Sequence, residues 1–229
     1  MSLADTELPA AATETPRRAR GRPRKTADER DDGNRRRELV AGAARLFRQQ
    51  GFAATTTRDI AAAVGMRAGS PFYHFESKEA LLGAVMLEGM QGALRRQQAA
   101  LAQLPAGAGA RERLRVLVRN HFDVLLGPDS DFIPVMLYEW RALSAVQRTE
   151  VNRLKDRYEA EWVPELEALH AQQQLGAEPA LARLMIFGAL NWSAQWYTPP
   201  SGRSARARAR ATLDELTDSA LQLFLKEPA

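Results

Sequence analysis

The sequence contains no cysteine and only three histidines among its 229 residues. The absence of thiols excludes disulfide bonds, thiolate metal sites and a cysteine nucleophile. His74, His121 and His170 lie far apart and lack the i, i+4 spacing of a helical zinc motif. The sequence also lacks a Ser-His-Asp arrangement, a carboxylate pair and a phosphate-binding loop, so we expect neither an enzyme nor a metal or cofactor site.

Segments that would direct the chain to or across a membrane are also missing. Residues 1–16 contain three acidic residues and neither the basic start nor the apolar core of a signal peptide. The longest apolar run, residues 184–190, is much shorter than the ~20 residues of a membrane-spanning helix. We therefore expect a soluble cytoplasmic protein without a membrane partner.

The net charge of +4 is unevenly distributed along the chain. Residues 1–16 carry three acids and no base, residues 17–82 carry 15 basic and 8 acidic residues, and residues 83–229 carry 17 of each. A basic N-terminal third joined to a neutral body is typical of a segment that binds a polyanion. A solvated run of charges is the alternative interpretation.

Helical periodicity dominates the chain from Arg35 onward. Leu39, Ala43 and Phe47 lie on one helix face, and Gly51 is placed to end that helix with a left-handed residue. Residues 1–34 contain few large apolar side chains, so we expect a disordered basic arm there. Because no alternating apolar and polar stretch competes with this pattern, we predict an all-α fold of about nine helices.

Two short helices follow Gly51. Thr56 and Asp59 have the spacing of a capping box, which starts a helix that ends before a turn at Gly65. A further short helix is expected at about residues 69–75. Two such helices joined by a glycine turn within a basic segment are typical of a helix-turn-helix.

The later helices are punctuated by caps, glycines and prolines. Ser77 and Asp131 are expected to cap two of them, and Pro164 is expected to kink or split a third. Three glycines in the helix that follows Ser77 indicate bending or close packing. The expected ranges are 78–103, 110–126, a short helix after Asp131, 145–174, 179–197 and 204–226.

Residues 35–82 resemble the DNA-binding domain of the TetR family. The matching motifs are Ala43-Ala44-Arg45-Leu46-Phe47, Gly51-Phe52, Thr55-Thr56-Thr57, Asp59-Ile60-Ala61, Gly65-Met66, Phe72-Tyr73-His74-Phe75 and Ser77-Lys78-Glu79-Ala80-Leu81-Leu82. The resemblance implies a dimeric, ligand-responsive regulator, most often a repressor, that binds a palindromic operator in double-stranded DNA. It also implies that residues 83–229 hold the effector pocket and the dimer interface. The alternative is a DNA-binding regulator or architectural protein without a small-molecule effector.

Ten residues are candidates for DNA contact. Arg67 and Ser70 have side chains that can bind bases or nearby phosphates. Several other candidates lie at helix starts or carry positive charge, and we expect these to contact phosphates. The family position of Tyr73 and His74 implies that they face the DNA backbone, although a core aromatic and a structural histidine are the alternatives. The candidates are Arg22, Arg24, Thr56, Thr57, Arg58, Arg67, Ser70, Tyr73, His74 and Lys78.

One residue departs from the family pattern. Pro71 stands where an aliphatic residue is usual, and proline has no amide for an intrahelical hydrogen bond. We therefore predict a shortened recognition helix that begins at residue 68 or later, with Ser70 and Pro71 as cap and first residue.

The arm preceding this domain contains Arg-Gly-Arg-Pro-Arg at residues 20–24. This stretch resembles an AT-hook core, in which arginines enter the narrow minor groove of A·T-rich DNA. Arg22 and Arg24 are therefore candidates for minor-groove contact. General attraction to phosphates and a solvated tail remain the alternatives.

All four tryptophans lie in residues 83–229. The motif Gly188-Ala189-Leu190-Asn191-Trp192, with nearby Trp196 and Tyr197, is similar to the branch of the family that responds to acyl-CoA, lipid or aromatic catabolites. Aromatic side chains of this kind can line a ligand cavity, or they can form an ordinary helical core. The candidate ligand contacts are His121, Tyr138, Trp140, Arg141, Trp162, Asn191, Trp192 and Trp196.

The last two expected helices carry an apolar stripe, and the resemblance implies that they pair with the same helices of a second subunit. The candidate interface residues are Ala182, Met185, Ala189, Leu213, Leu216, Ala220 and Leu223. Arginines at positions 203, 206, 208 and 210 precede the last stripe. They are expected to be solvated, or else to meet CoA phosphates or carboxylates of a partner.

Overall fold

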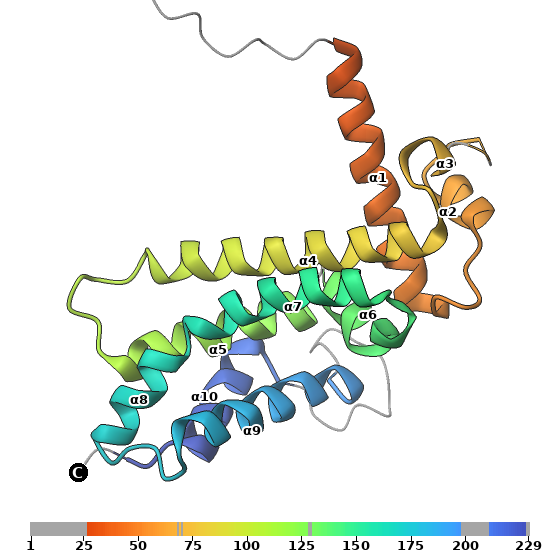
Figure 1. Cartoon of the computed structure of the whole chain (residues 1–229). Coiled ribbons are helices and arrows are strands. Elements are labelled where there is room, and N and C mark those ends of the chain that lie inside the picture. Colours follow the sequence, from red (N-terminus) through yellow and green to blue (C-terminus); the bar gives the residue numbers. More distant parts are fainter. Residues whose placement is uncertain (1–26, 68, 70, 128–129, 198–210, 228–229) are drawn as a thin grey trace, which may run out of the picture.

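The computed structural model describes residues 27–67, 69, 71–127, 130–197 and 211–227. These residues form helices, with one isolated bridge between Leu175 and Leu225, and the predicted all-α class is confirmed (Figure 1). Arg22, Arg24, Ser70, Pro128 and residues 198–210 lie outside the described residues. The elements are α1 (Ala27–Gln50), α2 (Thr57–Ala63), α3 (Pro71–His74), α4 (Lys78–Leu101), α5 (Ala110–Leu126), α6 (Phe132–Glu139), η1 (Trp140–Ala142), α7 (Ala145–Ala160), α8 (Val163–Ala171), α9 (Pro179–Trp192), η2 (Ser193–Gln195) and α10 (Leu213–Phe224).

The local signals of the helix-turn-helix produce the expected backbone. The Asp59 amide donates to Thr56 Oγ1 at 3.1 Å, and the Thr56 amide donates to the Asp59 carboxylate at 2.9 Å, which completes the capping box. Gly51 and Gly65 have φ values of 83° and 67°, in the left-handed region that favours glycine. α3 begins at Pro71, so the prediction of a shortened recognition helix is confirmed.

Several predicted boundaries are corrected. α1 begins at Ala27, so the expectation of disorder through residue 34 is wrong for residues 27–34, because extending an existing helix costs far less than nucleating one. Pro164 splits the expected long helix into α7 and α8. α10 begins only at Leu213, where Thr212 and Glu215 form another capping box. Asp131 makes no capping bond because its carboxylate accepts from Arg48 instead, at 3.1 Å.

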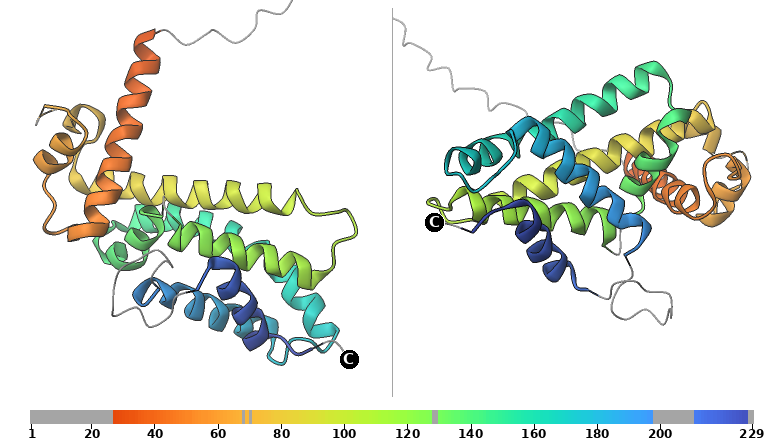
Figure 2. Two further views of the ribbon diagram at one scale, coloured as in Figure 1. Left: turned by 180° about the vertical axis from the view of Figure 1, so that it is seen from behind. Right: turned by 90° about the horizontal axis from the view of Figure 1, so that it is seen from below.

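α4 is the spine of the molecule and packs against α1, α5, α6 and α7 (Figure 1). α1 crosses one end of α4, with α2 and α3 beside it, while α9 and α10 lie on the far side of α5 (Figure 2). One continuous apolar cluster runs from Leu39 in α1 to Leu221 in α10. The core of the body and the core around α1 are therefore continuous.

The glycines of α4 allow close packing and leave the helix unbroken. A Cβ atom at Gly89 would lie 2.6 Å from the Cβ of Phe132 in α6, well inside van der Waals contact. Because Gly89 has no side chain, α6 packs directly against α4 at this position. Among the described residues, none of the helices combines the length and apolar character needed to cross a bilayer.

Candidate DNA-binding surface and effector cavity

The exposed face of the helix-turn-helix carries most of the described DNA candidates. Tyr73 is 83% exposed, which excludes a core role, and its ring stacks edge-on against His74 with centroids 5.3 Å apart. Arg58 and Arg67 are exposed, and Arg67 lines a hollow between α1 and α3 together with Arg35 and Tyr73. Thr56 is exposed as the α2 cap and Thr57 is half-buried. The surface presents aromatic and cationic groups, the combination that binds a nucleic acid backbone and base edges.

Lys78 has a different position from the one expected for a phosphate contact. Its Nζ donates to the carbonyl oxygens of Phe52 at 2.8 Å and Thr55 at 2.9 Å. The same ammonium lies 4.2 Å from the centre of the Phe52 ring, a cation–π contact. Lys78 thus holds the loop before α2 against the start of α4, and its phosphate contact stays a prediction.

A cavity of about 120 Å³ lies among α4, α5, α6, α7 and α9. His121 and Asn191, both predicted ligand contacts, meet in its wall, and most of the remaining lining is apolar. An apolar hollow with a few convergent polar groups is the usual form of a small-molecule site. The lining residues are Met90, Ala93, His121, Val124, Ile133, Met136, Lys155, Tyr158, Glu159, Leu184, Phe187 and Asn191.

The polar wall of the cavity is a chain of neutral groups. His121 Nε2 lies 3.1 Å from Asn191 Oδ1, and His121 Nδ1 lies 3.1 Å from the Tyr158 hydroxyl. Because the amide oxygen only accepts, Nε2 carries the proton and Nδ1 accepts from Tyr158. Burial lowers the pKa of His121 to about 4 and raises the pKa of Tyr158, so both groups are neutral at pH 7.

Charged groups occur where α7 and α9 border the cavity. Glu159 forms an ion pair with Lys155, one turn earlier on α7, at 3.6 Å, and a second ion pair with Arg183 on α9. The two cations therefore share one carboxylate, and the Glu159–Arg183 pair links α7 to α9. This charged group was not predicted from the sequence, although the i, i+4 spacing of Lys155 and Glu159 indicates an ion pair on one helix.

The other aromatic candidates lie away from the cavity. Trp162 is fully buried behind its wall, with the indole donating to Gln97 Oε1 at 2.9 Å and its ring 4.7 Å from Phe187. Trp192 is 65% exposed because it lies about 100° around α9 from Asn191. Tyr138, Trp140, Arg141 and Trp196 are likewise corrected: Tyr138 and Arg141 are exposed, and Trp140 and Trp196 pack at the edge of the core.

The apolar residues that line the cavity were also not predicted from helix periodicity. Phe187 and Leu184 reach the cavity from α9, Ile133 and Met136 from α6, and Met90 from α4. Residues of this type are common on core-facing helix faces throughout the chain. Only the packing of the helices shows which of them border an unfilled space.

α6 joins the cavity to the unit formed by α1, α2 and α3, which is called the DNA-binding unit below. Ile133 and Met136 line the cavity from its middle. At its start, Arg48 of α1 donates to Asp131 and to the Ser130 hydroxyl, both at 3.1 Å. At its end, the Glu139 carboxylate accepts from the Phe52 amide at 2.9 Å. One short helix thus borders the cavity and is held at both ends by residues next to the helix-turn-helix.

The candidate interface residues divide into two groups. Met185, Ala189 and Leu223 are exposed, whereas Ala182, Leu216 and Ala220 are buried against their own chain, and Leu213 is half-buried. The expectation is corrected for the three buried residues, because they pack against their own chain and hold α9 and α10 to the body. The exposed face of α9 also includes Leu181 and Trp192, which the helical period places with Met185 and Ala189.

Two sequence families match the chain. The family described as bacterial regulatory proteins, tetR family, matches residues 39–85, and that described as tetracyclin repressor-like, C-terminal domain, matches residues 107–225. The HTH-type transcriptional repressor KstR2 of Rhodococcus jostii (strain RHA1) is 34% identical over 140 residues, 58% of this chain and 64% of that protein. KstR2 of Mycobacterium tuberculosis (strain CDC 1551 / Oshkosh) is 28% identical over 124 residues, 54% of this chain and 59% of that protein. The chain thus spans less than two-thirds of the length of these relatives.

Solved structures share the fold over a larger part of the chain. The superantigen PfiT is 36% identical with a TM-score of 0.68, covering 83% of this chain and 96% of its own. AibR, solved with isovaleryl coenzyme A and operator DNA, is 24% identical with a TM-score of 0.71, covering 83% and 97%. FadR of Bacillus subtilis, solved with stearoyl-CoA, is 23% identical with a TM-score of 0.63, covering 82% and 96%.

Proposed function

The chain belongs to the TetR family of bacterial regulatory proteins, and on this premise we propose that it is a dimeric transcriptional repressor released from its operator by a small effector. The observation that carries this proposal is the position of α6, which lines the cavity and is bonded at both ends to the DNA-binding unit. A protein that binds chromosomal DNA in this way acts in the cytoplasm, at the nucleoid.

DNA reading is assigned to the exposed face of the helix-turn-helix. The short α3 enters the major groove, where Arg67 contacts a base edge or a nearby phosphate and Tyr73 contacts the backbone. Arg58 and the exposed start of α2 supply further phosphate contacts. The basic arm with Arg22 and Arg24 adds minor-groove contact.

A second copy of the chain supplies the other half-site. The exposed apolar face of α9 includes Met185 and Ala189. Exposure of this face to water is unfavourable, and a helix of the partner can bury it. Leu223 extends this surface at the end of α10 and lines a groove between the two helices. A two-fold dimer built on this face matches a palindromic operator.

The effector is proposed to be an apolar molecule with one hydrogen-bonding group, such as a short acyl chain with its carbonyl. The apolar lining suits the chain, and the neutral His121–Asn191 pair suits the hydrogen-bonding group. The acyl-CoA ligands of AibR and FadR, two proteins of the same fold, support this ligand class.

Release follows if the bound effector shifts α6. Occupancy of the cavity moves Ile133 and Met136, and the ends of α6 move Arg48 and Phe52 with them. The two DNA-binding units then no longer match the spacing of the half-sites. An effector achieves this only by binding the released form more tightly than the DNA-bound form.

A fluorescence anisotropy titration tests the proposal. The full chain is titrated into DNA from upstream of its own gene, with and without isovaleryl-coenzyme A. Saturable binding to a palindrome, weakened by the ligand and by Arg67→Ala, supports the repressor. Binding that no acyl-CoA or apolar probe alters favours the second candidate, a regulator without a small-molecule effector, and absence of binding overturns both for that DNA.

A further inference from the structure

A second groove lies beside the cavity, across a shared wall. Ala93 of α4, Val124 of α5 and Ile133 of α6 line both spaces, so a single layer of side chains separates them. The groove opens on the side of α4 that faces α1. Its other residues come mainly from α1 and α4, and it is therefore bounded by both the DNA-binding unit and the body.

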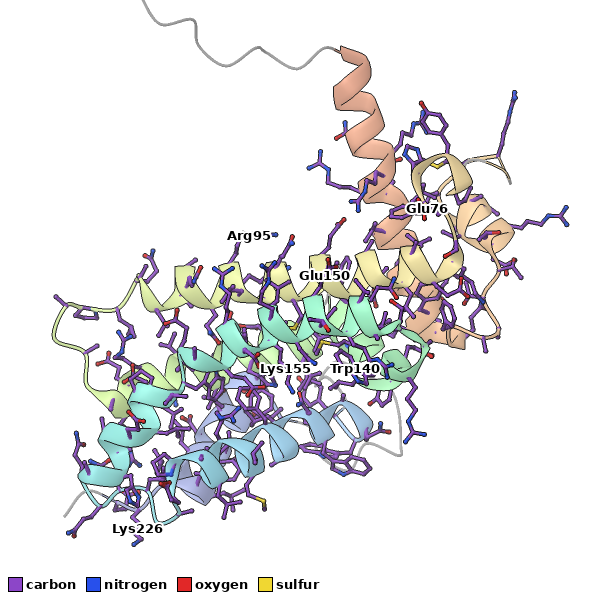
Figure 3. The ribbon with its side chains drawn as sticks, viewed as in Figure 1. Glu76, Arg95, Trp140, Glu150, Lys155 and Lys226 are labelled. Carbon is purple, nitrogen blue, oxygen red and sulfur yellow. The ribbon has the colours of Figure 1, made fainter. Side chains whose placement is uncertain are left out.

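The groove is strongly basic, unlike the cavity. Arg36 and Arg37 of α1 face Arg95 and Arg96 of α4, and the one acidic residue in the lining is Glu88, which pairs with Arg36. Both Arg95 and Arg96 are exposed, and within the described part of the chain neither makes a hydrogen bond or an ion pair. Figure 3 shows Arg95 standing clear of α4 toward α1.

Small residues keep the floor of the groove open. At Gly92 an added Cβ would meet nothing closer than Arg95 Nη2 at 4.0 Å, and Ala93 also presents little bulk. An anion can therefore reach the guanidinium groups from solvent. Guanidinium groups bind phosphate oxygens through paired, charge-assisted hydrogen bonds.

We propose that this arginine groove binds the phosphate-bearing head of the effector while the acyl group occupies the neighbouring cavity. This inference rests on the proposed function and narrows its ligand to an acyl group carried on a polyanionic nucleotide carrier, as in acyl-coenzyme A. The connecting arm crosses the shared wall, where Ala93, Val124 and Ile133 line both spaces.

The position of the groove gives the head group an effect on DNA binding of its own. Phosphate bound between α1 and α4 competes with Glu88 for Arg36 and draws α1 toward the spine. The head group and the acyl group then act on the DNA-binding unit through α1 and α6 respectively. Free acid, which lacks the phosphates, fills the cavity and engages α6 alone.

The test compares two double variants of the full chain by isothermal titration calorimetry. Arg95→Ala/Arg96→Ala removes the two unpaired guanidiniums, and Arg153→Ala/Arg157→Ala is the matched control, because both of its arginines are exposed on α7 away from either space. We expect the Kd for isovaleryl-coenzyme A to rise about tenfold for each groove guanidinium removed. We expect the control variant, and the affinity of either variant for free isovalerate, to match the wild type.

The outcomes that overturn the inference differ from those that overturn the repressor. Unchanged acyl-CoA affinity in Arg95→Ala/Arg96→Ala places the head group elsewhere. Loss of operator affinity in that variant with unchanged acyl-CoA affinity makes the groove a DNA contact instead. If the wild type binds neither coenzyme A nor its thioester, the inference falls, while operator binding in the same samples tests the repressor separately.

Discussion

The backbone amide of Phe52 donates to the carboxylate of Glu139 at 2.9 Å, although the two residues are 87 positions apart. Phe52 lies in the loop between α1 and α2, and Glu139 is the last residue of α6. The bond ties the helix that borders the cavity to the loop that leads into the helix-turn-helix. The proposed coupling between the effector and DNA binding runs through this bond.

Removing the Glu139 acceptor should weaken the effector response more than it weakens DNA binding. In Glu139→Ala the Phe52 amide loses its partner, at a cost of about 1 kcal/mol in stability. Operator affinity without effector should remain within a few-fold of the wild type, while the ligand-induced decrease in affinity shrinks. Anisotropy titrations with and without isovaleryl-coenzyme A measure both quantities, and Glu150→Ala on the exposed side of α7 is the control. An undiminished response in Glu139→Ala would contradict coupling through this bond.

Lys78→Met should destabilise the DNA-binding unit. The substitution keeps the stem length but leaves the Phe52 and Thr55 carbonyls without their charged donor, which we expect to cost about 1–3 kcal/mol. Urea denaturation measures this cost. If Lys78 contacts no phosphate, the slope of operator affinity against salt is unchanged, whereas a lost phosphate contact reduces the slope by about 0.9. A reduced slope with unchanged stability would restore the original assignment of Lys78.

His121 should make the fold sensitive to mild acid. Its pKa is about 4 in the folded chain, below the ordinary value of 6.5, so the unfolded chain binds a proton first as pH falls. Stability is therefore complete above about pH 6.5 and declines down to about pH 4, by about 3 kcal/mol from this residue. Urea denaturation at pH 7 and pH 4.5 measures the decline.

Two histidine variants assign that decline. His121→Gln should flatten the pH dependence, whatever it costs in stability at pH 7, because the titrating group is gone. His170→Gln, on the exposed side of α8, should keep the wild-type dependence. Equal curves for the wild type and His121→Gln would show that other groups dominate acid sensitivity.

The α9 face should control assembly. Met185→Glu places a charge in the middle of the exposed apolar stripe, and burying that charge in a dimer is costly. Sedimentation velocity should show a shift from dimer to monomer, with operator affinity reduced because half-sites are then bound singly. Val146→Glu is the matched control, because Val146 is equally exposed on α7, away from α9 and α10. A dimeric Met185→Glu variant would place the interface elsewhere.

The DNA-binding unit was the most predictable part of the molecule. The Thr56–Asp59 box, the left-handed Gly51 and Gly65 and the proline at the start of α3 each act on the backbone within a few residues. Such signals can be read directly from sequence because their partners are adjacent along the chain. The late start of α10 was harder to place, because the residues before it lie outside any apolar stripe.

The cavity was only partly predictable. His121 and Asn191 were selected as polar residues in an apolar region, and they lie 3.1 Å apart although 70 positions separate them. The tryptophans were predicted as ligand contacts from their residue type alone. In the structure Trp162 lies in the core and Trp192 is exposed to solvent. Residue type gives no indication of the rotation of one helix against its neighbours.

By itself the sequence determined the all-α class, the helix-turn-helix with its shortened recognition helix, and the concentration of positive charge in one third of the chain. These properties follow from period, local capping and composition, which need no distant partner. Tertiary structure decided that Lys78 clamps a loop, that α6 lies between cavity and DNA-binding unit, and that four arginines share a groove. Each of these depends on which distant helix faces meet, and that is set by the packing of the whole core.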